Sequence, residues 1–407
     1  MDQAKHNLYG LSLCLALSAL ILSVLVVPRN LGFSPSVLGL VFTGLYALVY
    51  KVRPRLFLPA IGMGVGIVAL ALASCLWALY PDAAWERTGK IAVVILPSLL
   101  LISVVAYIPL NHIGKYIRFI PMAYIIFLIL LNIEIWFNYP FFRLTRGLDF
   151  GMTVKDHELN RTTVCAVLML LPVSVLAMEF FKGKQKLAMV FLTLLALPFL
   201  LKTDSQSAQL AALVMLAFFF LFPYRCRYSW FTLMAAFVVG ILCAPWLASY
   251  LFTHHAATLH SLPGLGGGGA HVGNRMEVWD FISRFALQQP LAGFGIDVTK
   301  NVQTFDSKEI YQSGTYILHP HNFFLQVWIE FGALGAVLLS ASLIYILNTL
   351  RARLSIPAAR IALPSLMALI SVGLTGYGLW QAWWLGLIIL VITFIIIAIR
   401  VLDQKAV

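Results

Sequence analysis

The amino-acid sequence predicts an all-α, polytopic integral membrane protein. Of its 407 residues, 61% are hydrophobic and only 11% are charged, which is more apolar surface than a soluble chain of this length could bury. Runs of about 18 or more apolar residues recur from one end of the sequence to the other. These runs lack the alternation of barrel strands, and the helix is the other structure that satisfies its backbone in lipid.

We predict about twelve membrane-spanning helices in one integral membrane domain. Residues 1–251 hold the first nine, residues 252–321 form one long periplasmic loop with short helices, and residues 322–407 hold the last three. The first apolar run has no small-residue cleavage site, so we expect it to remain as a span. The predicted spans are 8–27, 33–50, 56–80, 91–110, 117–138, 162–181, 185–201, 206–223, 228–251, 322–349, 359–378 and 381–399.

The basic residues predict the orientation of these spans. With a cytoplasmic N-terminus, most of the 28 Lys and Arg residues fall in short inner loops, where membrane proteins concentrate them. Most of the others lie in two long loops, 139–161 and 252–321, and long loops count little toward orientation. This placement explains the net charge of +12 better than nucleic-acid binding does. We expect both termini in the cytoplasm, both long loops outside, and no nucleic-acid partner.

The five cysteines predict neither a metal site nor a disulfide framework. Four of them lie in apolar runs, and Cys226 lies in a short basic loop. None of their spacings matches a known ligand or bridge pattern. We therefore expect cysteine to serve here as a small core residue.

Each long outer loop ends where a helix is expected to begin. Asn160 is suited to the N-cap of the sixth span, and Arg161 would lie in its first turn. A cation there is unfavourable against the helix dipole, so Arg161 has either an anionic partner or the role of an interfacial anchor.

In the other long loop, 252–321, the four glycines at 266–269 predict a hinge. Asn274 and Glu277 resemble the capping box of a short helix lying along the membrane surface.

Two histidines stand at the mouth of the tenth span. His319 and His321 precede a strongly apolar run, and the N-terminal dipole of that helix favours a neutral imidazole and bound anions. We therefore interpret His321 as a general base. Arg161 and Arg275 are expected on the same side of the membrane, where guanidinium groups could grip a diphosphate. Metal ligation by histidines is an alternative, although no His-Glu-x-x-His helix is present.

Further along this run, two glycines and one carboxylate stand out. Gly332 and Gly335 are three residues apart, so they share a helix face and permit close backbone contact. Glu330 lies in the same predicted span. An ionisable group at that depth should face protein or water rather than lipid, and a paired structural carboxylate is the simplest interpretation.

These residues together resemble a known family. The pattern His321-Asn322, nine residues, Gly332, two residues, Gly335 is similar to the signature of bacterial O-antigen ligases, whose superfamily also holds O-antigen polymerases and some protein O-oligosaccharyltransferases. The likeness covers about 65 residues, 273–335, and the predicted topology extends it. The upstream part of the same module matches at Gly273-Asn274-Arg275, Glu277, Trp279, Pro290-Leu291, Gly293 and Gly295.

The resemblance implies a metal-independent, inverting glycosyltransferase of GT-C-like architecture in the bacterial inner membrane. Its active site would face the periplasm among membrane lipids and need no cofactor. The donor would be a glycan on undecaprenyl pyrophosphate, and the acceptor a sugar hydroxyl of lipid A-core. His321 would deprotonate the acceptor, and Arg275 would hold the pyrophosphate. We add Arg161 from its position, and His319, Asn322 and Asn274 as further substrate-binding residues.

One departure from the family concerns a cation. Many relatives carry a Ser-Arg-Gly-Ala-like element at the start of a middle span, where this chain has Gln206 in place of the arginine. Lys202 or Arg161 could supply the missing charge.

Other functions are alternatives to the ligase hypothesis. An O-antigen polymerase would share the donor but tends to have two comparable outer loops, and a protein O-oligosaccharyltransferase usually has a longer C-terminal region. A polysaccharide transporter or flippase would show internal repeats and polar helices at the midplane, which this sequence lacks.

Overall fold

The computed structural model describes all residues except 1, 150–153, 155, 262–271, 303–318 and 405–407. Within these described residues the chain is helical and contains no β-strand, so the predicted all-α fold is confirmed. The predicted glycine hinge at 266–269 lies outside the described residues. The longer helices are α1 (Asp2–Ser23), α2 (Ser34–Tyr50), α3 (Leu58–Ser74), α4 (Pro81–Tyr107), α6 (Phe119–Trp136), α8 (Asn160–Leu176), α9 (Gln185–Lys202), α10 (Gln206–Leu221), α11 (Arg227–Leu242), α12 (Ala244–Ser261), α13 (Val272–Ala286), α14 (Phe323–Arg353), α15 (Ile356–Thr375) and α16 (Ala382–Gln404).

Short helices join several of these elements. The short α-helices are α5 (Leu110–Ile113) and α7 (Pro140–Arg146). The 3-10 helices are η1 (Pro28–Gly32), η2 (Asp156–Leu159), η3 (Ala177–Phe181) and η4 (Val298–Asn301). Of these, η1 and η2 matter most for function, because both lead into the candidate site described below.

Several helices can cross a membrane, but the predicted number of twelve is not established. In the described part of the chain, seven helices are long and apolar enough to span, or eight if one bent pair counts as a single span. Four further apolar helices, α2, α3, α8 and α10, have only 16 or 17 residues. Helices of this length are at the short end of the range that crosses a hydrocarbon core.

The predicted ninth span, 228–251, is broken. It consists of α11 and the first part of α12, which meet at a bend of 75°. The sequence explains the break, because Pro245 has no N–H to donate to the carbonyl of Ile241 one turn earlier. The indole Nε1 of Trp328 donates to that carbonyl instead, at 2.7 Å. The bend turns α12 out of the bundle, where it packs against α13.

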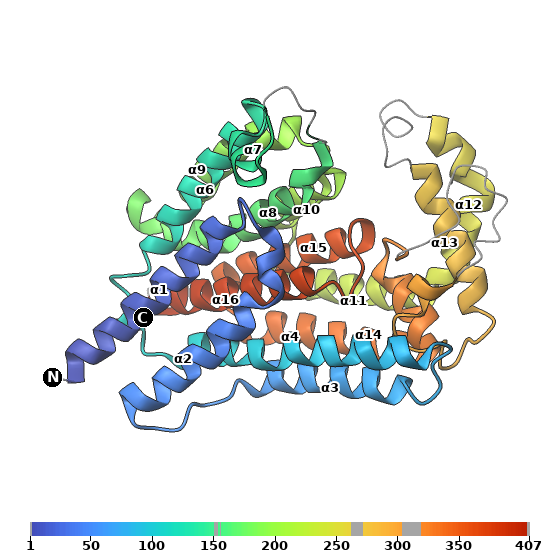
Figure 1. Cartoon of the computed structure of the whole chain (residues 1–407), viewed down its shortest axis with the longest axis horizontal. Helices are drawn as coiled ribbons and strands as arrows, with labels where there is room; N and C mark the ends of the chain where they lie inside the picture. The colour runs from blue at the N-terminus through green and yellow to red at the C-terminus, as the bar shows by residue number, and fades with distance from the viewer. Residues whose placement is uncertain (1, 150–153, 155, 262–271, 303–318, 405–407) are drawn as a thin grey trace.

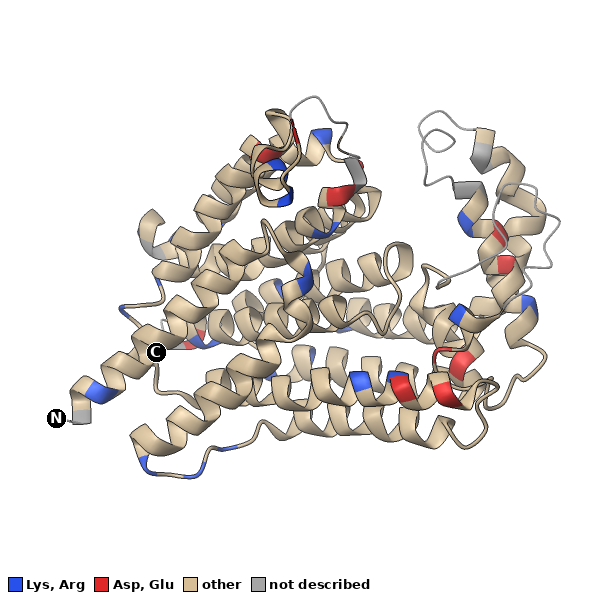
Figure 2. Ribbon diagram, in the orientation of Figure 1, with Lys and Arg blue, Asp and Glu red and all other residues tan. Residues whose placement is uncertain are grey.

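The helices form a bundle with two distinct ends. Both termini lie at one end, and the pair α12 and α13 crosses the opposite end (Figure 1). Charged residues lie mostly toward the ends of the helices (Figure 2). Both features fit a polytopic membrane protein whose termini share one side.

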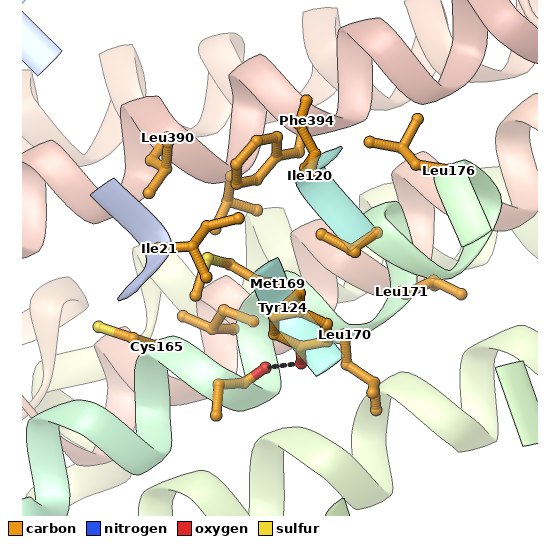
Figure 3. Packing of buried hydrophobic residues seen from close by; sticks show 14 of the residues in the cluster. Ile21, Ile120, Tyr124, Cys165, Met169, Leu170, Leu171, Leu176, Leu390 and Phe394 are labelled. Atoms are coloured by element: carbon orange, nitrogen blue, oxygen red, sulfur yellow. Dashed lines mark hydrogen bonds between the residues drawn. The ribbon is translucent and has the colours of Figure 1, made fainter. Parts of the chain in front are cut away.

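Helix α8 lies at the centre of the largest hydrophobic cluster. Every residue from Thr162 to Leu176 is buried. From Val164 to Leu176 its sequence is apolar apart from Ser174, as expected of a helix that is buried on all sides. Figure 3 shows Tyr124 of α6 packed against this helix, with its hydroxyl donating to the Ala166 carbonyl at 2.5 Å. This anchor fixes the start of α8, which carries part of the site.

Helix α14 is broken at Gly332, where the backbone adopts φ 58° and ψ −151°. The connection after α13 docks into this break, since the Pro290 carbonyl accepts from the Ala333 N–H at 2.7 Å. A Cβ at Gly332 would lie 2.6 Å from the carbonyl carbon of Leu291, so only glycine fits. The expected close backbone contact is present, but its partner is this connection. The expectation of one continuous helix face through Gly332 is wrong.

Candidate active site

One polar cavity of about 390 Å³ brings together side chains from six separate parts of the chain. Its walls come from η1, from η2 and the start of α8, from the connection between α9 and α10, from α13, from the turn before α14, and from the turn after α15. The lining residues are Arg29, Glu158, Asn160, Arg161, Asp204, Ser205, Gln206, Ser207, Arg275, His321, Gly376 and Tyr377. Three arginines and one histidine therefore meet in a space large enough for a diphosphate.

His321 is held in one tautomer by the backbone. Its Nδ1 lies 2.5 Å from the carbonyl oxygen of Gly376, and because a carbonyl can only accept, Nδ1 must carry the proton. In the neutral ring, Nε2 is then free to accept a proton. His321 also has φ 53°, an uncommon conformation for a residue other than glycine. Such strained residues often occur at functional sites.

The surroundings of His321 favour its neutral form. Burial lowers the pKa of its imidazole below the ordinary value of 6.5, and the nearby Arg275 cation acts in the same direction. The Gly376 hydrogen bond opposes this shift, because it stabilises the charged ring. The balance keeps an unprotonated nitrogen available at neutral pH.

The segment around His321 is pinned from two sides. The ring of His319 packs against that of His321 with centroids 4.1 Å apart, and the Trp279 Nε1 donates to the Pro320 carbonyl at 2.8 Å. Gly378 packs so closely that a Cβ there would lie 3.0 Å from the His319 ring. Burial lowers the pKa of His319 to about 3, and its Nε2 has no hydrogen-bond partner within the described residues. His319 supports His321 but does not line the cavity.

Arg275 enters the cavity from α13. Burial lowers the pKa of its guanidinium, so an anion in the cavity would relieve an unfavourable burial of charge. The helix begins at Val272, which puts Asn274 in its first turn and corrects the prediction of Asn274 as N-cap. The Oδ1 of Asn274 is buried without a hydrogen-bond partner in the described part of the chain. Asn274 is absent from the cavity lining.

Arg161 and Arg29 also line the cavity. Helix α8 begins at Asn160 with Leu159 at the N-cap, so the prediction of Asn160 as N-cap is corrected by one residue. The Arg161 guanidinium lies 5.6 Å from the centre of the Trp383 ring. Sequence reasoning missed Arg29, although a basic residue in a short outer loop runs against the usual charge distribution and could have drawn attention to it.

Comparison with known proteins bears on this cavity. Residues 189–340 match the family described as O-antigen ligase. Over these residues the chain is similar to O-antigen ligases. A candidate polysaccharide ligase of Rickettsia typhi is 26% identical over 255 residues, which cover 60% of this chain and 58% of that protein. Another, from Rickettsia bellii, is 26% identical over 279 residues, or 63% and 61%.

A shorter match has a higher sequence identity. A candidate polysaccharide ligase of Rickettsia prowazekii is 30% identical over 128 residues, which cover 29% of this chain and 31% of that protein. The chain spans less than two thirds of the length of the Rickettsia typhi protein. No solved structure matches the chain.

The O-antigen ligase domain supplies only part of the cavity. It contains His321, Arg275 and Gln206, whereas Arg29 and Arg161 precede it. Gln206, which stands where the resemblance leads us to expect an arginine, lines the cavity. Of the two residues expected to replace that charge, Arg161 shares the cavity, while Lys202 lies 4.7 Å from the Trp136 ring and is absent from the lining.

Asn322 has a local role in the O-antigen ligase domain. Its side-chain oxygen caps α14 by accepting from the N–H groups of Phe324 and Leu325, at 3.0 and 3.4 Å. It does not line the cavity. The cap fixes where the helix starts and therefore where His321 points.

A buried network around Glu330 lies behind His321, and its link to the histidine was not predicted from the sequence. Glu330 is fully buried, and its carboxylate accepts from Gln326 Nε2 at 3.0 Å and from Trp380 Nε1 at 2.5 Å. It thus faces protein, as expected for this depth. Gln326 Oε1 accepts from the Leu379 N–H at 2.8 Å. These bonds hold the turn that presents the Gly376 carbonyl to His321.

The remaining histidines with described side chains on α12, His254 and His255, are exposed and away from this cavity. Within the described residues, no three His, Cys, Asp or Glu side chains gather closely enough to hold a metal ion.

Proposed function

We propose that this protein is an inverting glycosyltransferase that joins a glycan from undecaprenyl pyrophosphate to a sugar hydroxyl of lipid A-core. The observation that carries the proposal is the sharing of one cavity by His321, with Nε2 free to accept a proton, and by Arg275, Arg161 and Arg29. The match of residues 189–340 to the O-antigen ligase family supports the reaction class.

In the proposed reaction, His321 Nε2 takes the proton of the acceptor hydroxyl. The hydroxyl oxygen then attacks the anomeric carbon of the donor from the face opposite the diphosphate. The bond between that carbon and the diphosphate oxygen breaks, and undecaprenyl diphosphate leaves with its electron pair. The transferred proton remains on His321 until water removes it.

The arginines are proposed to hold the leaving group. Negative charge grows on the diphosphate as the bond breaks, and fixed cations in a partly dry cavity stabilise it most at that moment. Arg275 is the most buried of the three and therefore the least screened by water. Arg161 and Arg29 extend the cationic wall, so the proposed reaction assigns the leaving-group charge to arginine rather than to a metal ion.

We further propose that the cavity opens to the periplasm and that the chain lies in the inner membrane with a GT-C-like arrangement. Helix α14 starts beside the cavity and ends at Arg351 and Arg353, in a basic connection. The cavity is thus at the opposite end of α14 from residues that favour the cytoplasm. Lipid-linked donor and acceptor would both reach it from the outer leaflet.

The deciding experiment offers the purified protein its proposed donor with two acceptors in competition. Undecaprenyl-pyrophosphate-linked glycan would be mixed with lipid A-core and with a second lipid-linked glycan. We expect glycan on lipid A-core. Elongated lipid-linked glycan as the main product would instead make the protein a polymerase, and movement of the donor across a bilayer without any transfer would make it a flippase.

A further inference from the structure

A second hollow lies on the outside of the bundle, far along α14 from His321. It is an apolar groove of about 410 Å³ between α11 and the second half of α14. Its α11 wall runs from Phe231 to Val239 at helical spacing, and its α14 wall contains Ile344. The nine residues from Phe231 to Val239 extend about 12 Å along the helix axis, which is long enough to hold part of a hydrocarbon chain.

The groove has one polar end. Among the described residues that line it, Asn348 alone is polar, and Asn348 Oδ1 accepts from Arg351 Nη2 at 2.9 Å. The Arg351 guanidinium also lies 5.1 Å from the centre of the Phe231 ring, which is the last groove residue on α11 at that end. The cation is therefore fixed at the mouth of the groove, with contacts to both walls.

This mouth carries an excess of positive charge. Two segments meet here: 222–227 before and at the start of α11, and 349–360 from the end of α14 into α15. They contain five arginines and no acidic residue: Arg225, Arg227, Arg351, Arg353 and Arg360. None of the five is in an ion pair with a described residue. The Nε atoms of Arg351 and Arg360 are buried and have no hydrogen-bond partner within the described part of the chain. Buried guanidinium donors without an acceptor call for an anion.

We propose that this groove binds an anionic phospholipid, with one acyl chain between α11 and α14 and the phosphate on Arg351. The apolar walls fit the chain, and the uncompensated arginines fit the headgroup. Because α14 ends here in its basic connection, the lipid belongs to the leaflet opposite the His321 cavity, the predicted cytoplasmic leaflet. The site is separate from the proposed transfer reaction.

The test compares two lipids on the delipidated full-length protein in detergent, with bound lipid counted by native mass spectrometry. Dioleoyl phosphatidylglycerol should bind more tightly than dioleoyl phosphatidylcholine. Arg351→Gln should weaken phosphatidylglycerol binding about fivefold, the effect of one cation at an anionic lipid surface. Arg353→Gln removes the same charge from an exposed position two residues away and should leave binding unchanged.

A second matched pair tests the groove itself and does not depend on the arginine variants folding. Ala235→Phe fills the groove and should abolish tight phosphatidylglycerol binding, while Ala236→Phe, on the neighbouring exposed position of α11, should retain it. Equal binding of the two lipids would overturn the proposal. Equal losses of phosphatidylglycerol binding in Arg351→Gln and Arg353→Gln would also overturn it, because binding would then reflect overall positive charge. Equal losses in Ala235→Phe and Ala236→Phe would do the same, because any bulky change on the surface of α11 would then be enough.

Discussion

His321 and Arg161 line one cavity but are held by different kinds of contact. His321 is fixed by the Gly376 carbonyl, by the His319 ring and by the Trp279 bond to Pro320. Arg161 is placed by stacking over Trp383, and within the described residues no hydrogen bond or ion pair of its guanidinium is found.

The difference separates chemistry from binding. A proton acceptor has to be positioned closely and in one tautomer, so backbone hydrogen bonds suit it. A cation facing a diphosphate can act through charge over a range of positions. We therefore expect changes to His321 and its contacts to reduce turnover strongly. Changes to Arg161 or Arg29 should weaken donor binding moderately.

The largest effect should come from His321→Ala. Loss of a general base typically lowers the rate by about 10²–10⁴-fold, and we expect kcat for glycan transfer to fall within that range. His254→Ala, an exposed histidine on α12, is the matched control and should transfer glycan normally. Near-normal lipopolysaccharide ladders in cells carrying His321→Ala would refute the base role.

Arg275→Ala should come next. It removes a largely buried cation, and charged hydrogen bonds contribute about 1.5–3 kcal/mol, so kcat/KM should fall by about 10–150-fold. Arg275→Lys keeps the charge and should lose less. Arg284→Ala lies on the same helix at a more exposed position and serves as control. Equal, negligible effects of both Arg275 variants in the purified transfer assay would remove Arg275 from diphosphate binding.

Gln326→Met tests the network behind His321. The change leaves the Leu379 N–H and one Glu330 oxygen without Gln326, so the turn bearing Gly376 loses an anchor. We expect kcat to fall about tenfold with little change in donor KM, because only the position of the base is affected. Ser340→Ala removes another buried polar group of α14 and should change neither value. A rise in donor KM alone would contradict the positioning role.

Arg29→Gln should have the smallest effect. Arg29 is exposed, and ion pairs in water contribute about 1 kcal/mol or less, so donor KM should rise at most about fivefold. Arg146→Gln, another exposed arginine, should leave donor KM unchanged. A loss as large as that of Arg275→Ala would show that the exposed and the buried arginine do not differ as proposed.

The sequence predicted the helical fold, and it placed His321, Arg161 and Arg275 on one side because topology alone orders the ends of spans. It did not predict Arg29 or the Gly376 carbonyl, since both reach the cavity through packing between distant helices. Arg29 sits in η1, which lies against α16 where Gly386 has no side chain to block Leu31. Such a contact depends on how distant helices pack together, and no local sequence pattern predicts it.

The first residues of two helices were also not predicted correctly from the sequence. Asn160 and Asn274 are good capping residues, yet α8 and α13 begin one and three residues earlier than their patterns suggest. The break at Gly332 was hidden for a related reason. A glycine within an apolar run reads as a packing position, and only the docked connection at Leu291 reveals the need for a positive φ.

The most direct test is the pH dependence of kcat/KM for glycan transfer, which reports the free enzyme. Because burial lowers the His321 pKa below 6.5, the base should remain unprotonated at neutral pH. We predict a rate that holds as the pH falls to 6.5 and drops only at lower values, with this acid limb missing from the residual activity of His321→Ala. An acid limb above pH 6.5, or one that persists unchanged in His321→Ala, would contradict a neutral His321 as the base.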